Sequence, residues 1–136
     1  MVWDPSRIAP ASWPGALEFY RHIEDRNHDF GALRQLVEHI GAQAYVSSIH
    51  CATSGTSLLV ARRPDGEWAS DSLRIDLDLS GAIRFVHSDP RLLKPQIFTC
   101  EGPAIVGAFE RFLGRARWAA AIATGGDAPG ASGRRL

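Results

Sequence analysis

Hydrophobic residues recur with a helical period near both ends of the chain. Pro14 suits the first turn of a helix, and the apolar residues from Ala16 to Arg26 fall on one helical face. A second segment has i, i+3, i+4, i+7 spacing and a glycine stop after it: Leu33, Leu36, Val37 and Ile40, then Gly41. Glu101-Gly102-Pro103 is typical of a helix start, and the apolar pattern continues to Ile122. We expect an N-terminal helical hairpin, or one bent helix, and a C-terminal helix.

Between these regions the hydrophobic pattern repeats every two residues, which is typical of β-strands. The expected strands are 43–51, 56–63, 73–79 and the segment after Gly81, followed by a short strand at 96–100. Leu73 to Leu79 alternates strictly between aliphatic and charged residues, so this strand has one face in contact with water. The strands would form an antiparallel meander of four to five strands.

The turns between these strands set the expected register. A tight turn at Ser54-Gly55 would place Cys51 opposite Leu58 and Ile49 opposite Val60. Residues 63–67 (Arg-Pro-Asp-Gly-Glu) predict a second turn, which would bring Arg62 beside Trp68.

For the following turn, a two-residue loop at Ser80-Gly81 would place Leu77 opposite Arg84 and mix the two faces, so we expect a three-residue loop. With a loop over Leu79-Ser80-Gly81 and a left-handed Gly81, Leu77 lies opposite Ile83, Ile75 opposite Phe85, and Asp76 opposite Arg84.

These elements together predict an α+β fold, a two-layer sandwich in which the helices cover one face of the sheet. The expected organisation is an extended arm at 1–13, a single α+β domain at 14–123 and a disordered Gly-, Ala- and Pro-rich tail at 124–136. The chain of 136 residues suits one domain.

Composition narrows the range of functions. The 15 basic and 15 acidic residues cancel, which argues against a general nucleic-acid binder. No apolar run approaches the roughly 20 residues that span a bilayer, so we expect no membrane association. Arginine outnumbers lysine by 14 to 1, which indicates GC-rich coding and a bacterial source. Without an export signal, Cys51 and Cys100 are expected to be reduced thiols in a cytoplasmic protein.

Motifs for catalysis are missing from the sequence. The five histidines lack helical i, i+4 spacing, and no nucleophile elbow, phosphate loop or dinucleotide fingerprint occurs. Asp76 and Asp78 share a strand face, about 7 Å apart. Since Arg74 and Arg84 flank them and lower carboxylate pKa values, we interpret them as an ion-pair ladder. We therefore predict no catalytic residue, metal or cofactor.

The sheet face that the helices leave open is the predicted binding surface. It carries four charged residues, here called the charged sheet face: Arg74, Asp76, Asp78 and Arg84. Complementary charge sets partner specificity and association rate. The leading hypothesis is a small non-enzymatic protein-binding domain of the immunity or inhibitor type, by analogy of size and layout alone.

Two further hypotheses stay open. A small-molecule-binding or small enzyme domain would need a pocket between sheet and helices, with polar lining from Tyr45, His50, His87 and Cys100. A homodimer through the sheet face or its edge is compatible with either function.

Overall fold

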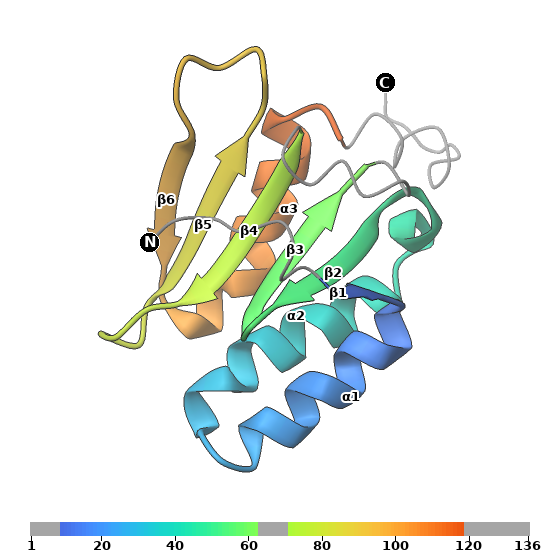
Figure 1. The fold of residues 1–136 in the computed structure, drawn as a ribbon, viewed down its shortest axis with the longest axis vertical. Coiled ribbons are helices and arrows are strands. Elements are labelled where there is room, and N and C mark those ends of the chain that lie inside the picture. Colours follow the sequence, from blue (N-terminus) through green and yellow to red (C-terminus); the bar gives the residue numbers. More distant parts are fainter. Residues whose placement is uncertain (1–8, 63–70, 119–136) are drawn as a thin grey trace.

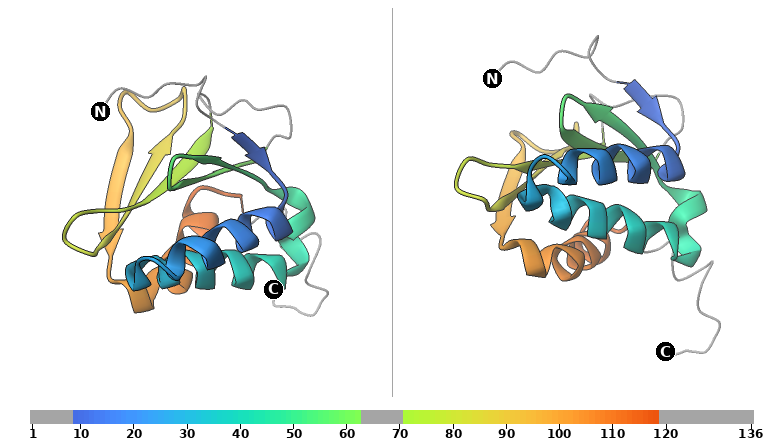
Figure 2. Two further views of the ribbon diagram at one scale, coloured as in Figure 1. Left: turned by 60° about the horizontal axis from the view of Figure 1, so that its bottom comes forward. Right: turned by 90° about the horizontal axis from the view of Figure 1, so that it is seen from below.

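The computed structural model describes residues 9–62 and 71–118, which form an antiparallel sheet with helices packed against one of its faces (Figure 1). Six strands lie in chain order: β1 (Ala9–Ala11), β2 (His50–Ser54), β3 (Ser57–Ala61), β4 (Ser72–Leu77), β5 (Ile83–Ser88) and β6 (Gln96–Cys100). The helices are α1 (Trp13–Glu24), α2 (Gly31–Gly41) and α3 (Ile105–Arg115). Figure 2 shows the sheet and the helices as two layers. The predicted α+β sandwich with its N-terminal helical hairpin and C-terminal helix is confirmed.

The hairpin helices begin and pack as their sequence indicates. Ser12 caps α1 by accepting a hydrogen bond from the Gly15 amide at 3.0 Å, with Pro14 in the first turn. A short 3₁₀ turn, η2 (His28–Phe30), leads into α2. The predicted stripe on α2 is fully buried: Leu33, Leu36, Val37 and Ile40.

The β4–β5 hairpin has the predicted register. Leu77 pairs with Ile83, and Asp76 pairs with Arg84. Gly81 is left-handed at φ +89°, and the Asp78 amide donates to the Ala82 carbonyl at 2.9 Å across the three-residue loop.

The β2–β3 register differs from the expectation by two residues. Cys51 lies opposite Val60 instead of Leu58, and the two-residue loop is Gly55-Thr56. Gly55 has φ +62°. In this class of turn the left-handed residue comes first in the loop, so the loop begins at the glycine rather than at Ser54. Because the shift is even, the same side chains still face the helices.

The prediction that a strand runs from Gln43 to Cys51 is wrong over most of its length. Residues Ala44–Ser48 form a 3₁₀ helix, η3, and β2 begins only at His50. Tyr45 is buried there against Phe109 of α3, with ring centroids 6.5 Å apart. This tertiary contact outweighs the local alternation of apolar residues.

The C-terminal helix is shorter than its apolar pattern suggested. It ends at Arg115 instead of Ile122, and Arg117 adopts a left-handed φ of 66° just after it. The Arg117 amide donates to the Gly114 carbonyl at 3.3 Å, which closes the helix end in the manner of a left-handed cap.

Part of the expected arm belongs to the sheet. Ala9–Ala11 is extended as predicted, but it pairs with Cys51–Thr53 as edge strand β1. Residues 1–8, the turn at 63–67 with its Arg62–Trp68 contact, residues 119–122 and the tail at 124–136 lie outside the described residues.

The main core lies between the sheet and the helices. Its strand contribution is Leu58, Val60, Leu73, Ile75, Ile83 and Phe85, all with essentially no exposed surface. Burial of each such side chain stabilises the fold by about 1.5–3 kcal/mol. Phe85 stacks on Phe98 of β6 at 4.7 Å. In the described residues, no helix is long and apolar enough to cross a membrane.

Candidate functional site

The charged sheet face forms one depression on the side of the sheet opposite the helices. Its cavity volume is about 910 Å³, and Arg74, Asp76, Asp78 and Arg84 all contribute to its lining. Ser57 and Ser72 are buried at its base. The structure therefore brings together the four residues that the sequence placed on one face.

Arg74 and Asp76 form a fixed ion pair in this depression. Arg74 Nε lies 3.2 Å from Asp76 Oδ1, and Arg74 Nη2 donates to Ser57 Oγ at 3.1 Å. The Ser57 hydroxyl in turn donates to Asp76 Oδ1. Both charged side chains are about one-fifth exposed, at 21% each. Because three groups hold one another, the pair presents its charges in a single arrangement.

Asp78 has a separate role from Asp76, although both lie on the same strand face. Its carboxylate accepts hydrogen bonds from the Ser80 amide at 2.8 Å, the Ser80 hydroxyl at 2.6 Å and the Ala82 amide at 3.3 Å. The Ser80 hydroxyl and then its amide hold the pKa of Asp78 below its usual range, with a smaller contribution from Arg84. Asp78 therefore closes the β4–β5 turn, and the expected ion-pair ladder is reduced to the Arg74–Asp76 pair with Arg84 across the sheet.

Three large hydrophobic side chains in the described part of the chain are exposed, and two of them, Leu79 and Ile97, are on the side of the sheet that carries the charged sheet face. Leu79, at 109% relative exposure, is in the β4–β5 turn and lines the depression. Leu93, at 106%, lies in the β5–β6 loop at the opposite end of the strands. Ile97 on edge strand β6 pairs with Val86, a lining residue, and so shares its face. The charged depression thus has an exposed leucine in its lining, and an exposed isoleucine lies on the same sheet face at the β6 edge.

The four residues proposed for an alternative pocket do not converge. The Tyr45 hydroxyl donates to Glu110 of α3, and His39 Nε2 lies 2.9 Å from the same carboxylate oxygen. Cys100 is half-buried on β6, where burial raises its pKa and Arg111 partly offsets this.

His50 and His87 lie in different cavities. His50 lines an apolar groove of about 740 Å³ beside α1, α2 and η3. His87 lines a smaller cavity beside α3.

Neither cysteine is set up as a nucleophile. Both are free thiols, as expected. Burial raises the pKa of Cys51 to about 12, and its thiol donates to the Ala11 carbonyl at 3.5 Å. A thiol with this pKa is protonated near neutral pH, whereas catalysis needs the thiolate.

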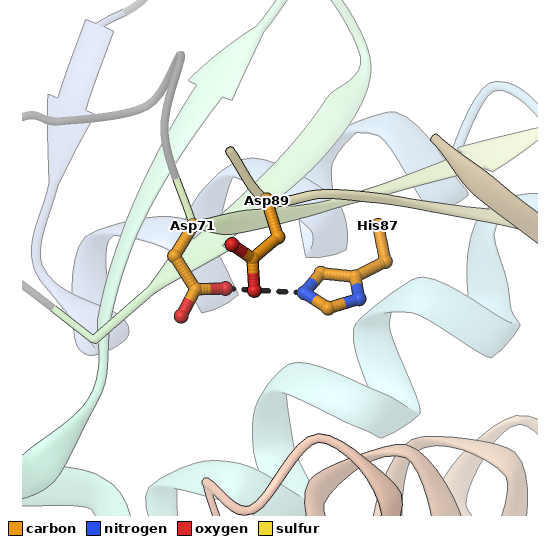
Figure 3. A group of neighbouring side chains, drawn as sticks. All are labelled: Asp71, His87 and Asp89. Atoms are coloured by element: carbon orange, nitrogen blue, oxygen red, sulfur yellow. Dashed lines mark hydrogen bonds and ion pairs between the residues drawn. The ribbon is translucent and has the colours of Figure 1, made fainter. Parts of the chain in front are cut away.

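The structure also brings together three potential ligand side chains that no sequence motif indicated: Asp71, His87 and Asp89. Figure 3 shows both carboxylates on the Nε2 side of the His87 ring. His87 Nε2 lies 3.1 Å from Asp71 Oδ1, and one potential ligand atom from each residue lies within 4.8 Å of the others. The His87 ring is buried edge-on against Phe112, 4.9 Å away.

A signal for this cluster was present in the sequence. Asp89 comes two residues after His87, directly beyond the end of β5, and an extended backbone there places both side chains on one face. The correctly predicted β4–β5 register, extended beyond Ser72 and Ser88, places Asp71 opposite Asp89. Ligand spacing within a single element does not reveal this cluster, because Asp71 and Asp89 lie at the ends of two neighbouring strands.

Arginines neutralise the two carboxylates of the cluster. Arg91 Nε lies 3.0 Å from each oxygen of Asp89, and this pairing lowers the pKa of Asp89 to about 2. Arg62 Nε lies 3.6 Å from Asp71 Oδ2.

Comparisons with known proteins give no homologue: no protein-family model matches the chain, and no curated protein or solved structure matches it significantly.

Proposed function

We propose that this protein is a small non-enzymatic binding domain that recognises a partner protein through the charged sheet face, in the manner of an immunity or inhibitor protein. One observation carries the proposal. Four charged side chains and the exposed Leu79 line one depression, and the exposed Ile97 lies on the same sheet face. A polar, charged patch combined with exposed large apolar side chains is typical of recognition surfaces.

The chemistry of the charged sheet face favours binding of one specific partner over nonspecific binding. The Arg74–Asp76–Ser57 arrangement is held in place before binding, so little side-chain entropy is lost on association. Leu79 and Ile97 supply apolar area that a partner would remove from water. The free thiols agree with the bacterial cytoplasm that the proposal assumes.

The alternative function, a small-molecule or enzyme pocket between sheet and helices, has weaker support. Its four candidate groups are distributed among separate places, and Tyr45 is engaged by Glu110. The partner-binding proposal needs no movement of these residues.

The test compares two faces of the same protein. C-terminally tagged chain captures partners from native lysate, and the partner's affinity is then measured with purified components. Leu79→Ser with Arg84→Glu alters the sheet face at exposed positions without removing the Asp78 turn bonds. Arg26→Glu is the control, since it makes the same charge reversal at an exposed site beyond α1.

We expect a stoichiometric partner whose affinity falls at least tenfold for the sheet-face variant and stays unchanged for Arg26→Glu. Equal binding by wild type and the sheet-face variant would contradict the proposal. So would the absence of any partner in lysate of the source organism.

A further inference from the structure

A second polar cavity lies beside α3, at the end of the sheet where β3 and β5 finish. It has a volume of about 440 Å³, and we call it the arginine hollow. Its charged and polar lining is Arg62, His87, Asp89, Arg91, Gln96, Arg115 and Arg117, beside apolar Phe112, Leu92 and Ala116. These residues come from the end of β3, the β5–β6 segment and the end of α3, so only the fold assembles them.

The charges of the hollow do not cancel. Among the described residues, four guanidinium groups line it, against the carboxylate of Asp89 and that of Asp71, which contacts His87. The described residues of the hollow therefore carry two net positive charges, in a chain whose total charge is zero.

The acids and the arginines occupy different depths. The Asp89 side chain is only 5% exposed, whereas that of its partner Arg91 is 76% exposed. Asp71 in the same way has less exposure than Arg62, at 21% against 47%. The carboxylates therefore lie behind the guanidinium groups and orient them, and N–H donors of the arginines remain on the solvent side.

The other two arginines of the hollow are Arg115, at the end of α3, and Arg117, just after it. The guanidinium of Arg115 lies 4.8 Å from the centre of the Phe98 ring. Arg117 occupies the left-handed position after the helix, which glycine normally takes at lower energetic cost. Strained residues of this kind cluster at functional sites.

We propose that the arginine hollow binds the phosphoryl group of a small phosphorylated molecule. A phosphate monoester carries close to two negative charges near neutral pH, which matches the charge of the hollow. Guanidinium groups bind phosphate oxygens through paired N–H donors. The volume of the hollow lies within the range of small-ligand sites.

A divalent cation fits the same residues less well. Asp71, His87 and Asp89 offer three ligand atoms. Both carboxylates, however, are already paired with arginines, which a cation would have to displace while four positive charges repel it.

The test is isothermal titration of the full chain with inorganic phosphate, at constant ionic strength and with acetate as the monoanion control. Arg117→Gly and Arg115→Gln remove one guanidinium each. Arg117→Gly also suits the left-handed backbone, so the variant retains its folded state. Arg26→Gln removes an exposed arginine outside the hollow, and melting temperatures without phosphate check folding for all variants.

We expect saturable binding at one site, weakened about tenfold or more in each hollow variant and unchanged in Arg26→Gln. Equal weakening in Arg26→Gln, or no phosphate binding by the wild type, would overturn the proposal. Titration with Zn²⁺ or Mn²⁺ separates the cation alternative: saturable metal binding that Asp89→Asn abolishes would also overturn it.

Discussion

Polar and charged side chains in this protein are held by specific hydrogen-bond partners, some in the same segment and some in another element. Asp89 is held by Arg91 of the same loop, Asp76 by Arg74 of its own strand and Ser57 of β3, and Tyr45 by Glu110 of α3. Each of these contacts orders a polar side chain at the boundary between core and solvent, where hydrogen bonds to charged groups are strongest. Stability and its pH dependence should therefore respond to individual substitutions at these positions.

The pairing of Asp89 with Arg91 predicts a loss of stability in acid. The pKa of Asp89 in the folded chain is about 2, below its ordinary value of 3.8. The ionised carboxylate therefore stabilises the fold above about pH 4, and this contribution is lost as the pH falls towards 2. Urea unfolding across this range should show a steeper loss for wild type than for Asp89→Asn.

Asp25→Asn, which removes an exposed carboxylate at the end of α1, controls for the change in total charge. Identical pH profiles for wild type and Asp89→Asn would contradict the role of the Asp89–Arg91 pair.

The hydroxyl of Tyr45 connects η3 to α3 through Glu110, and its removal should lower stability. Tyr45→Phe deletes the hydrogen bond but keeps the ring buried against Phe109. We expect a loss of about 1 kcal/mol in the free energy of unfolding, since Glu110 is partly exposed. Urea denaturation of Tyr45→Phe, Glu110→Gln and the double variant measures the coupling. Additive effects of the two single changes would show that the bond contributes nothing.

Among the structural elements, the β4–β5 hairpin has the register that the sequence predicted, because its strands have one charged and one apolar face. In β4 and β5, a two-residue loop would have placed Leu77 opposite Arg84, which favoured the three-residue loop. In β2 and β3 the register differs from the expectation by an even shift of two residues, which keeps every side chain on its own face and so leaves the hydrophobic pattern unchanged. Their register depends on the backbone geometry of the turn, which the hydrophobic pattern does not report.

The left-handed glycine of the β4–β5 turn gives a direct test of this element. Gly81→Ala should destabilise the protein by about 1–2 kcal/mol, because φ +89° is unfavourable for any residue with a Cβ atom. Gly114→Ala is the control, since a Cβ there meets nothing within 4 Å and the position is helical. That change should stabilise by about 0.5–1 kcal/mol. Thermal unfolding of both variants measures these changes. If both substitutions changed the melting temperature in the same direction, the left-handed backbone of Gly81 would not explain the effect.

At the end of α3 the situation is reversed, because a residue with a side chain, Arg117, occupies a left-handed position. Arg117→Gly should raise the free energy of unfolding by about 1 kcal/mol, because glycine takes the left-handed position without strain. Urea denaturation measures this. Unchanged or lower stability would show that contacts of the Arg117 side chain outweigh the relief of backbone strain.

At the scale of the whole molecule, the order of strands leaves β1 and β6 at the two edges of the described sheet. Gln96–Cys100 contains no charged residue, and Ile97 is 60% exposed. Edge strands without charges are prone to pair with another chain. This edge gives the homodimer hypothesis a defined location, beside the charged sheet face.

We expect sedimentation at increasing concentration to show association of the wild type through β6. Ile97→Lys should abolish it, because a lysine on an edge strand opposes strand pairing. Thr99→Lys, which changes an exposed residue two positions along the same strand, distinguishes edge pairing from contact through Ile97 alone. A mass that stays monomeric at all concentrations would restrict the proposed function to a different protein as partner.

The sequence by itself determined the fold class, the buried stripe of α2, the β4–β5 register and the grouping of Arg74, Asp76, Asp78 and Arg84 on one face. All of these follow from periodicity within an element or across one short turn, where covalent geometry limits the alternatives. Tertiary structure alone decided the 3₁₀ conformation around Tyr45, the sheet position of Ala9–Ala11 and the early end of α3. It also assembled the arginine hollow, whose residues come from segments up to 55 positions apart. Contacts between such distant segments depend on how the elements pack together, and no local pattern encodes that packing.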